Sequence, residues 1–192
     1  MAMSHETITH PIDLTASTLV AVSRAALSSL RASLLRDAGP ASAAYFQEAG
    51  YAGGAAVYEA FRTWLLERGL GSPDSLGVEE FAGHASEYFR DLGWGSIRLG
   101  ALRDTVATLD SPDWGEVDPS GGLEQPGCHL STGMFADFFG RIAATPLAVM
   151  EVECRSAGDS RCRFLLGSAE VMERLYESMA EGKGYEAAVE SI

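Results

Sequence analysis

The three cysteines of this chain constrain its fold more than any other feature, because two of them flank a turn. Cys154 and Cys162 enclose a segment centred on Gly158, between β-like runs over residues 147–155 and 161–166. In a simple antiparallel hairpin these two cysteines face each other, with Cβ atoms about 4.5–5.5 Å apart. A tetrahedral zinc ion with Zn–S distances of about 2.3 Å needs sulfurs about 3.8 Å apart, so this pair can bind one.

Cys128 supplies a third sulfur from the predicted start of a helix, where backbone N–H groups favour the thiolate. An odd number of cysteines, in a chain that does not begin with a recognisable secretion signal, argues against a disulfide framework. Three interpretations remain: a zinc site, three inert buried cysteines, or a disulfide between Cys154 and Cys162. The reducing compartment that we infer makes the disulfide the weakest of the three. Spacing alone supports the other two equally.

The fourth ligand of such a site has several candidates, namely Glu151, Glu153, His129 or a water molecule. Strand alternation places Glu151 and Glu153 on one face, and Val152 and Cys154 on the other. A carboxylate can therefore join Cys154 only through a bulge or at a strand end. A zinc ion closed by four protein ligands would be structural, because a catalytic zinc usually keeps an open position.

The composition excludes several classes of function. The 192 residues suit one domain, or one domain with an added helical layer, and 46% of them are hydrophobic. Acidic residues outnumber basic ones by 27 to 14, and the net charge of −13 disfavours direct binding to nucleic acid or to anionic lipid. No uncharged apolar run of about 18 residues occurs, so we expect no membrane span and a cytoplasmic protein.

Hydrophobic spacing and turn residues predict an α+β fold, in which a small antiparallel sheet packs with several helices. Helical patterns cover residues 15–37, 41–68, 77–91, 128–142 and 168–181. Gly50, Gly53 and Gly54 weaken the second pattern, so we expect two helices or a bend there. We expect a functional lid over residues 111–127 and a frayed end after residue 181. Strand patterns, the first two of them joined as a hairpin, cover residues 96–102, 103–109, 147–155 and 161–166.

The motif around the cysteine hairpin resembles that of a known family. Residues 151–164 read E-x-x-C-x-x-x-G-x-x-x-C-x-F, and Cys128 lies 26 residues upstream of the first cysteine of this motif. With the segment Phe138-Phe139-Gly140-Arg141 before it, the motif is similar to the 4-vinyl reductase domain family, also called hydrocarbon-binding domains. The resemblance is strongest over residues 94–168. It divides the chain into a tail and helix (1–39) and a hydrocarbon-binding domain (40–192).

The resemblance implies a metal and a ligand set that spacing alone does not. Sensor domains of phenol-responsive transcriptional activators in this family bind zinc through three cysteines and a glutamate. The matching residues here are Cys128, Glu151, Cys154 and Cys162. Zn²⁺ is therefore the expected cofactor, and Glu151 is favoured over Glu153. No ATPase or DNA-binding segment follows the domain here, so we expect any signal to pass to a separate partner protein.

Aromatic residues near the expected site suggest an apolar cavity beside it. A zinc ion that pins the hairpin to the Cys128 helix would hold one wall of this cavity, and the 111–127 loop would close its mouth. The alternative is that at least half of these residues fill an ordinary core. Core packing explains Trp114 least, because it lies in a loop rich in glycine and proline. The candidate ligand-binding residues are Phe89, Trp94, Trp114, Met134, Phe135 and Phe138.

These observations favour a binding module over an enzyme. No catalytic constellation stands out, and a G-x-G-x-x-G dinucleotide fingerprint is missing from the sequence. Our leading hypothesis is a zinc-stabilised sensor or carrier for a small apolar, aromatic or tetrapyrrole-like ligand. One alternative is a protein interaction or scaffold module with a vestigial pocket. A vinyl reductase of bacteriochlorophyll synthesis, which the family name suggests, is less favoured.

A homodimer is a further prediction from the N-terminal helix. Exposed apolar stripes seek a partner, and homodimers are the commonest oligomers. The alternative is that this stripe packs on the sheet of its own chain. The stripe consists of Leu19, Val22, Ala26, Leu30 and Leu34.

Overall fold

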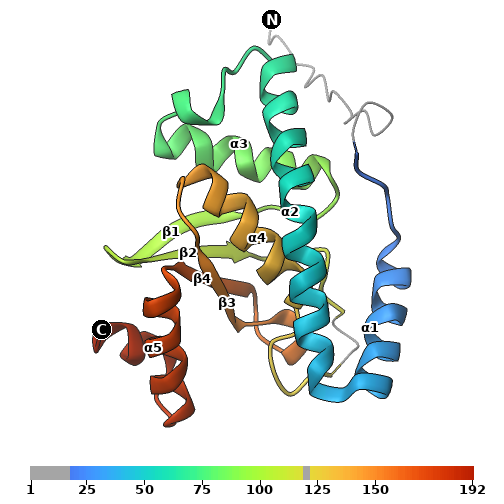
Figure 1. Ribbon diagram of the computed structural model, residues 1–192, viewed down its shortest axis with the longest axis vertical. Coiled ribbons are helices and arrows are strands. Elements are labelled where there is room, and N and C mark those ends of the chain that lie inside the picture. Colours follow the sequence, from blue (N-terminus) through green and yellow to red (C-terminus); the bar gives the residue numbers. More distant parts are fainter. Residues whose placement is uncertain (1–17, 119–121) are drawn as a thin grey trace, which may run out of the picture.

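Four antiparallel strands form one sheet with helices packed on both faces, in a computed structural model that describes residues 18–118 and 122–192 (Figure 1). The strand order is β1-β2-β4-β3. The strands are β1 (Arg98–Arg103), β2 (Val106–Ser111), β3 (Ala148–Glu153) and β4 (Cys162–Gly167). The α-helices of the described residues are α1 (Arg24–Ala38), α2 (Ser42–Glu67), α3 (Val78–Asp91), α4 (His129–Ile142), α5 (Ala169–Ala180) and α6 (Tyr185–Glu190). The predicted α+β class is confirmed, and β1 and β2 pair as the expected hairpin.

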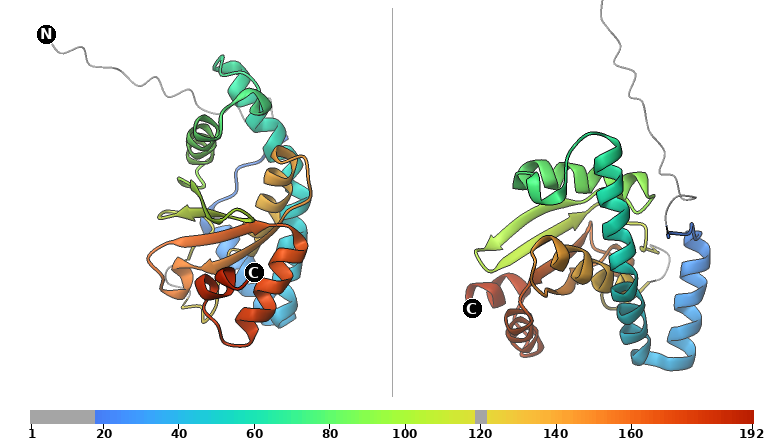
Figure 2. Two further views of the ribbon diagram at one scale, coloured as in Figure 1. Left: turned by 90° about the vertical axis from the view of Figure 1, so that its left-hand side faces the viewer. Right: turned by 45° about the horizontal axis from the view of Figure 1, so that its top comes forward.

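Side-chain alternation along β4 separates two hydrophobic cores. Phe164 and Leu166 belong to the larger core, which also contains residues of α2, α3 and α4 and all three cysteines. Leu165, which lies between them, packs on the opposite face with Met172 and Leu175 of α5. Figure 2 shows α3 and α5 on opposite sides of the sheet. The metal-ligand candidates therefore lie on the side of the sheet that α4 covers.

Helix α2 runs without interruption for 26 residues, so the predicted break at its glycines is wrong. Gly50 instead allows α4 to approach closely, because a Cβ at this position would lie 1.9 Å from the carbonyl oxygen of Leu130. Gly133 of α4 makes the reciprocal contact, since its Cβ would lie 2.0 Å from the carbonyl oxygen of Gln47. The unfavourable helix propensity of these glycines is offset by direct backbone contact between the two helices.

The structure also corrects the predicted ends of the chain. Helix α1 begins at Arg24 rather than at residue 15, because Ser23 caps it by accepting a hydrogen bond from the N–H of Ala26 (3.2 Å). Residues 15–17 of the predicted helix lie outside the described residues. Helix α1 lies beside α2 and not on the sheet (Figure 1). The predicted frayed end contains α6, which places Ala188 and Val189 in the smaller core.

The segment after β2 is irregular, as predicted, but its first part is not a lid. Trp114, Glu116 and Val117 are buried, and only 1% of Trp114 is exposed. The indole Nε1 of Trp114 donates a hydrogen bond to the Ser131 hydroxyl oxygen (2.7 Å). The expected lid is therefore wrong for residues 114–117, which belong to the interior of the domain.

A separate finding concerns membranes. Within residues 18–118 and 122–192, none of the helices has both the length and the apolar character that a bilayer crossing requires.

Alanine substitutions at two glycines of α2 should have opposite effects on stability. Gly50→Ala forces a methyl group into the backbone of α4, so we expect it to lower the free energy of unfolding by about 2 kcal/mol. Gly53→Ala adds a methyl group in open space and should raise it by about 0.5–1 kcal/mol through helix propensity. Urea denaturation followed by circular dichroism measures both changes. Equal shifts for the two variants would contradict the close α2–α4 contact.

Candidate metal centre

Four side chains from separate parts of the chain converge inside the larger core. One ligand atom from each of Cys128, Glu151, Cys154 and Cys162 lies within 4.8 Å of the others, and all four residues are buried. The sulfur of Cys128 lies 3.8 Å from that of Cys154 and 4.0 Å from that of Cys162. All three cysteines are free of disulfide bonds. The structure thus brings together the four residues that the sequence motif grouped.

The β3–β4 hairpin positions two of these sulfurs. Glu153 pairs with Arg163, so the next residues outward, Cys154 and Cys162, lie at the same end of the hairpin. The Asp159 carboxylate in the connecting turn accepts a hydrogen bond from the N–H of Cys154 (2.7 Å). The carbonyl oxygen of Cys154 in turn accepts one from the N–H of Asp159 (3.2 Å). This reciprocal pair fixes the backbone next to the first sulfur.

A β-bulge in β3 brings a carboxylate to the same place as the sulfurs. The register with β4 shifts between Glu151 and Glu153, so Val152 is an extra residue and the alternation of side chains is interrupted. Glu151 accepts a hydrogen bond at Oε2 from the N–H of Cys128 (2.7 Å). A carboxylate was expected to join Cys154 only through a bulge or at a strand end, and the structure contains the bulge.

The other two side chains considered as a fourth ligand lie elsewhere. The Glu153 carboxylate accepts hydrogen bonds from Arg161 Nε (2.8 Å) and from the Tyr185 hydroxyl group of α6 (2.5 Å). The hydrogen bond from Arg161 lowers the pKa of Glu153. His129 is the first residue of α4, and its ring lies outside the group of converging ligand atoms. Glu151 is therefore the carboxylate of the cluster.

The cluster carries donor atoms for a cation but few hydrogen bonds of its own. Burial and the neighbouring charge of Cys154 raise the pKa of Glu151 to about 8. Hydrogen bonds with Cys128 and Cys162 lower the pKa of the Cys154 thiol, while the same contact with Cys154 raises the pKa of Cys128. Oε1 of Glu151 is buried without a hydrogen-bond partner. Three sulfurs and an unpartnered carboxylate oxygen fit a soft or borderline divalent cation.

A buried ion pair that the sequence analysis did not identify holds the start of α4. The Glu116 carboxylate accepts hydrogen bonds from the N–H groups of Leu130 (3.1 Å) and Ser131 (2.8 Å). Arg31 of α1 donates to Glu116 from Nη2 (3.0 Å). Burial raises the pKa of Glu116, opposed by the hydrogen bond from Ser131 and by the charge of Arg31. No local capping pattern reveals Glu116, because it precedes the helix by an irregular segment.

The residues predicted to bind a ligand lie together, but most of them form packed core. Phe89 contacts the rings of Trp114, Phe135 and Phe138, with ring centroids 5.3–5.7 Å apart. These four residues and Met134 are buried in the larger core. Trp94 is half-buried, stacks on Trp114 at 5.4 Å, and also lines a surface groove beside α1. Core packing therefore accounts for Trp114, the residue that it was expected to explain least.

Comparison with known proteins identifies the family of the central segment. Residues 116–168 match the 4-vinyl reductase domain family, and this range includes all four residues of the cluster as well as Glu116. The match confirms the resemblance that the cysteine motif indicated. No curated protein sequence matches the chain at a significant level.

Several solved structures are similar to this chain. The phenol-responsive sensory domain of the transcription activator PoxR, with phenol, gives a TM-score of 0.59 and 17% identity over 79% of this chain and 77% of that one. A trafficking protein particle complex subunit 3 from Naegleria fowleri, covalently bound to palmitic acid, gives 0.57 and 14% over 75% and 91%. A vinyl-4-reductase family protein from Methanocaldococcus jannaschii gives 0.45 and 16% over 62% and 66%. The first two similarities show a shared fold.

Glu116→Gln should destabilise the domain, because it leaves the guanidinium group of Arg31 buried beside a neutral partner. We expect the free energy of unfolding to fall by about 3 kcal/mol, the usual cost of breaking a buried ion pair. Glu124→Gln is the matched control, since Glu124 is exposed in the same connection and should change stability by less than about 0.5 kcal/mol. Chemical denaturation measures both. Similar stability of the two variants would contradict this role of Glu116.

Proposed function

We propose that this chain, which carries a 4-vinyl reductase domain over residues 116–168, is a sensor or carrier of a small apolar or aromatic molecule and contains a structural zinc ion. The observation that carries the proposal is the buried cluster of Cys128, Glu151, Cys154 and Cys162. The fold shared with a phenol-responsive sensory domain supports a sensor of small molecules.

The geometry of the cluster supports zinc as the ion. The two sulfur–sulfur distances of 3.8 and 4.0 Å agree with the separation of about 3.8 Å that a tetrahedral zinc site requires. A carboxylate oxygen completes a set of four protein ligands. Glu151 fits this role because its Oε2 is held by the N–H of Cys128 while its buried Oε1 has no hydrogen-bond partner.

An ion in this place would be structural. Cys128 is the N-cap residue of α4, whereas Cys154 and Cys162 belong to the β3–β4 hairpin. Four protein ligands leave no open position for a substrate or an activated water molecule. The ion would therefore link helix to sheet and add its binding free energy to that of folding.

A binding role follows from this structural view of the centre, and it ranks the alternatives. A vinyl reductase stays below a sensor or carrier, because a closed metal site supplies no reaction centre. An interaction module with a vestigial pocket is the second candidate, since Val22 and Leu30 of the predicted dimer stripe are exposed. We propose a homodimer and a separate signalling partner as the assemblies through which such a protein would act.

Metal analysis tests the zinc centre directly. Full-length protein purified without chelator should contain about one zinc ion per chain, as measured by inductively coupled plasma mass spectrometry. Cys154→Ser and Glu151→Gln should each weaken zinc binding at least about 10-fold, because each removes a ligand. Both should also lower the melting temperature, since the ion links helix to sheet.

Glu153→Gln is the control for Glu151→Gln, because Glu153 lies two residues away but bonds to Arg161 instead. It should retain the zinc content of the unmodified chain. Loss of zinc from Glu153→Gln together with retention in Glu151→Gln would overturn the assignment of the fourth ligand. A folded protein without any bound metal would overturn the centre itself.

Ligand binding tests the function. Isothermal titration of the zinc-loaded chain with phenol, naphthalene and protoporphyrin should find at least one ligand that binds one per chain. Its heat-capacity change should be negative, because apolar surface is buried. Native mass spectrometry provides an independent readout of the complex. Absence of binding across this panel by both methods would argue against a sensor or carrier.

A further inference from the structure

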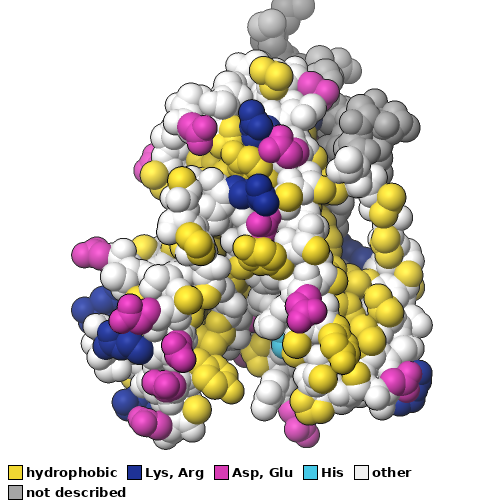
Figure 3. Space-filling model, in the orientation of Figure 1, with side chains coloured by type: hydrophobic (Ala, Val, Ile, Leu, Met, Phe, Trp, Pro, Cys, Tyr) yellow, Lys and Arg dark blue, Asp and Glu magenta, His cyan; other side chains and the backbone are white. Residues whose placement is uncertain are grey.

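A groove beside α1 is built almost entirely from apolar side chains. It lies between α1 with the segment before it, α2, and the connection from α3 to β1, and has a volume of about 420 Å³. Its walls include Leu27 and Leu30 of α1, Phe46 and Ala49 of α2, and Trp94. Figure 1 shows α1 and α2 side by side, and Figure 3 shows apolar side chains gathered over this pair of helices. The volume falls within the usual range of small-molecule sites.

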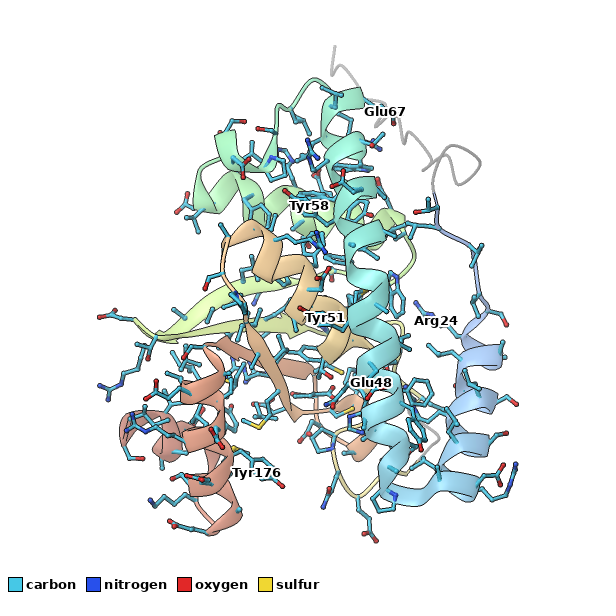
Figure 4. All side chains as sticks on the ribbon, in the orientation of Figure 1. Arg24, Glu48, Tyr51, Tyr58, Glu67 and Tyr176 are labelled. Atoms are coloured by element: carbon cyan, nitrogen blue, oxygen red, sulfur yellow. The ribbon has the colours of Figure 1, made fainter. Side chains whose placement is uncertain are left out.

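The lining of the groove suits an uncharged ligand. Arg24 is the one charged residue among its lining residues, and its Nη2 donates a hydrogen bond to the carbonyl oxygen of Gly93 (3.1 Å). Figure 4 shows Arg24 at the beginning of α1. The contact joins the start of this helix to the end of α3 across the groove. Because this guanidinium group already bonds to the protein, we expect a neutral ligand rather than an ionic one.

One wall is aromatic and supported by the core. Trp94 stacks on Trp114 with 5.4 Å between ring centroids and 22° between ring planes. Trp114 is itself buried against Phe135 at 5.0 Å. The wall is therefore held by the packed aromatic core and can offer an aromatic ring a preformed surface.

The opposite wall exposes apolar side chains to water. Val20, Val22 and Leu30 all line the groove, yet 81%, 65% and 52% of their surface is exposed. Arg31, the buried residue of α1, anchors the helix through Glu116 on its other side. A small apolar ligand in the groove would remove part of this exposed surface from water, which is favourable.

We propose that this groove is the ligand-binding site and that its ligand is a neutral aromatic or alicyclic hydrocarbon of one or two rings. The inference rests on the proposed sensor or carrier function and moves its binding site. Phe89, Phe135 and Phe138, which were expected to line the pocket, are filled core, whereas Trp94 provides the wall of the groove.

A fluorescence titration of the full chain with N-phenyl-1-naphthylamine tests the site, because the emission of this neutral probe rises in apolar surroundings. Ala49→Phe fills the groove and should weaken probe binding at least 10-fold. Ala44→Phe is the control, because Ala44 is exposed on the same helix but is not a lining residue of the groove. It should leave the affinity within twofold of that of the unmodified chain.

A second pair of variants keeps the test independent of any packing defect. Leu30→Lys places a charge at the exposed edge of the groove and should also weaken binding at least 10-fold. Leu35→Lys, at an exposed position of α1 outside this groove, should have no effect beyond twofold. Far-ultraviolet circular dichroism verifies that all four variants fold.

The outcomes separate this inference from the proposed function. Unchanged probe binding in both Ala49→Phe and Leu30→Lys would overturn the groove while the sensor or carrier function stands. No binding of the probe, phenol, naphthalene or protoporphyrin to the unmodified chain would overturn both. Light scattering supplies the remaining arm: if Ala49→Phe converts a dimer to a monomer without changing probe affinity, a second copy occupies the groove and the inference is wrong.

Discussion

The meeting of three thiols and one carboxyl group at the end of the β3–β4 hairpin is the constraint on which the rest of this structure depends. Cys154 and Cys162 come from the hairpin, and Cys128 comes from the start of α4, so an ion bound by them joins sheet to helix. Buried acidic groups are unfavourable unless a cation or hydrogen-bond donors compensate them. Glu151 has one compensated oxygen and one without a partner, which is why a metal explains the cluster better than three inert cysteines do.

The position of α4 is fixed independently by two other contacts. Gly50 and Gly133 let its backbone touch that of α2, and Glu116 bonds to the N–H groups at its first turn. Arg31 completes the charge of Glu116 and attaches α1 to the same place. The end of α4 that carries Cys128 is thus held from three directions: by the cluster, by α2 and by the buried ion pair. A ligand beside α1 would lie next to this junction.

The aromatic residues show how packing decides between a core and a pocket. Phe89, Trp114, Phe135 and Phe138 contact one another closely enough to fill the interior, so their number in the sequence does not imply a cavity among them. The space lies instead where α1 stands beside α2. No periodicity signals this groove, because its walls come from segments that are distant along the chain. Trp94 is the predicted ligand-binding residue that belongs to both the aromatic cluster and the groove wall.

The sequence by itself determined the α+β class, the hairpin around Gly158 and the identity of the three sulfurs, because each depends on spacing within a short segment. Only the tertiary structure decided that a bulge at Val152 directs Glu151 and not Glu153 to the sulfurs. It also decided that the glycines of α2 serve a helix contact, and that Glu116 holds the start of α4. The physical reason is that strand register, interhelical distance and buried ion pairs depend on partners far away in the chain, which no local pattern contains.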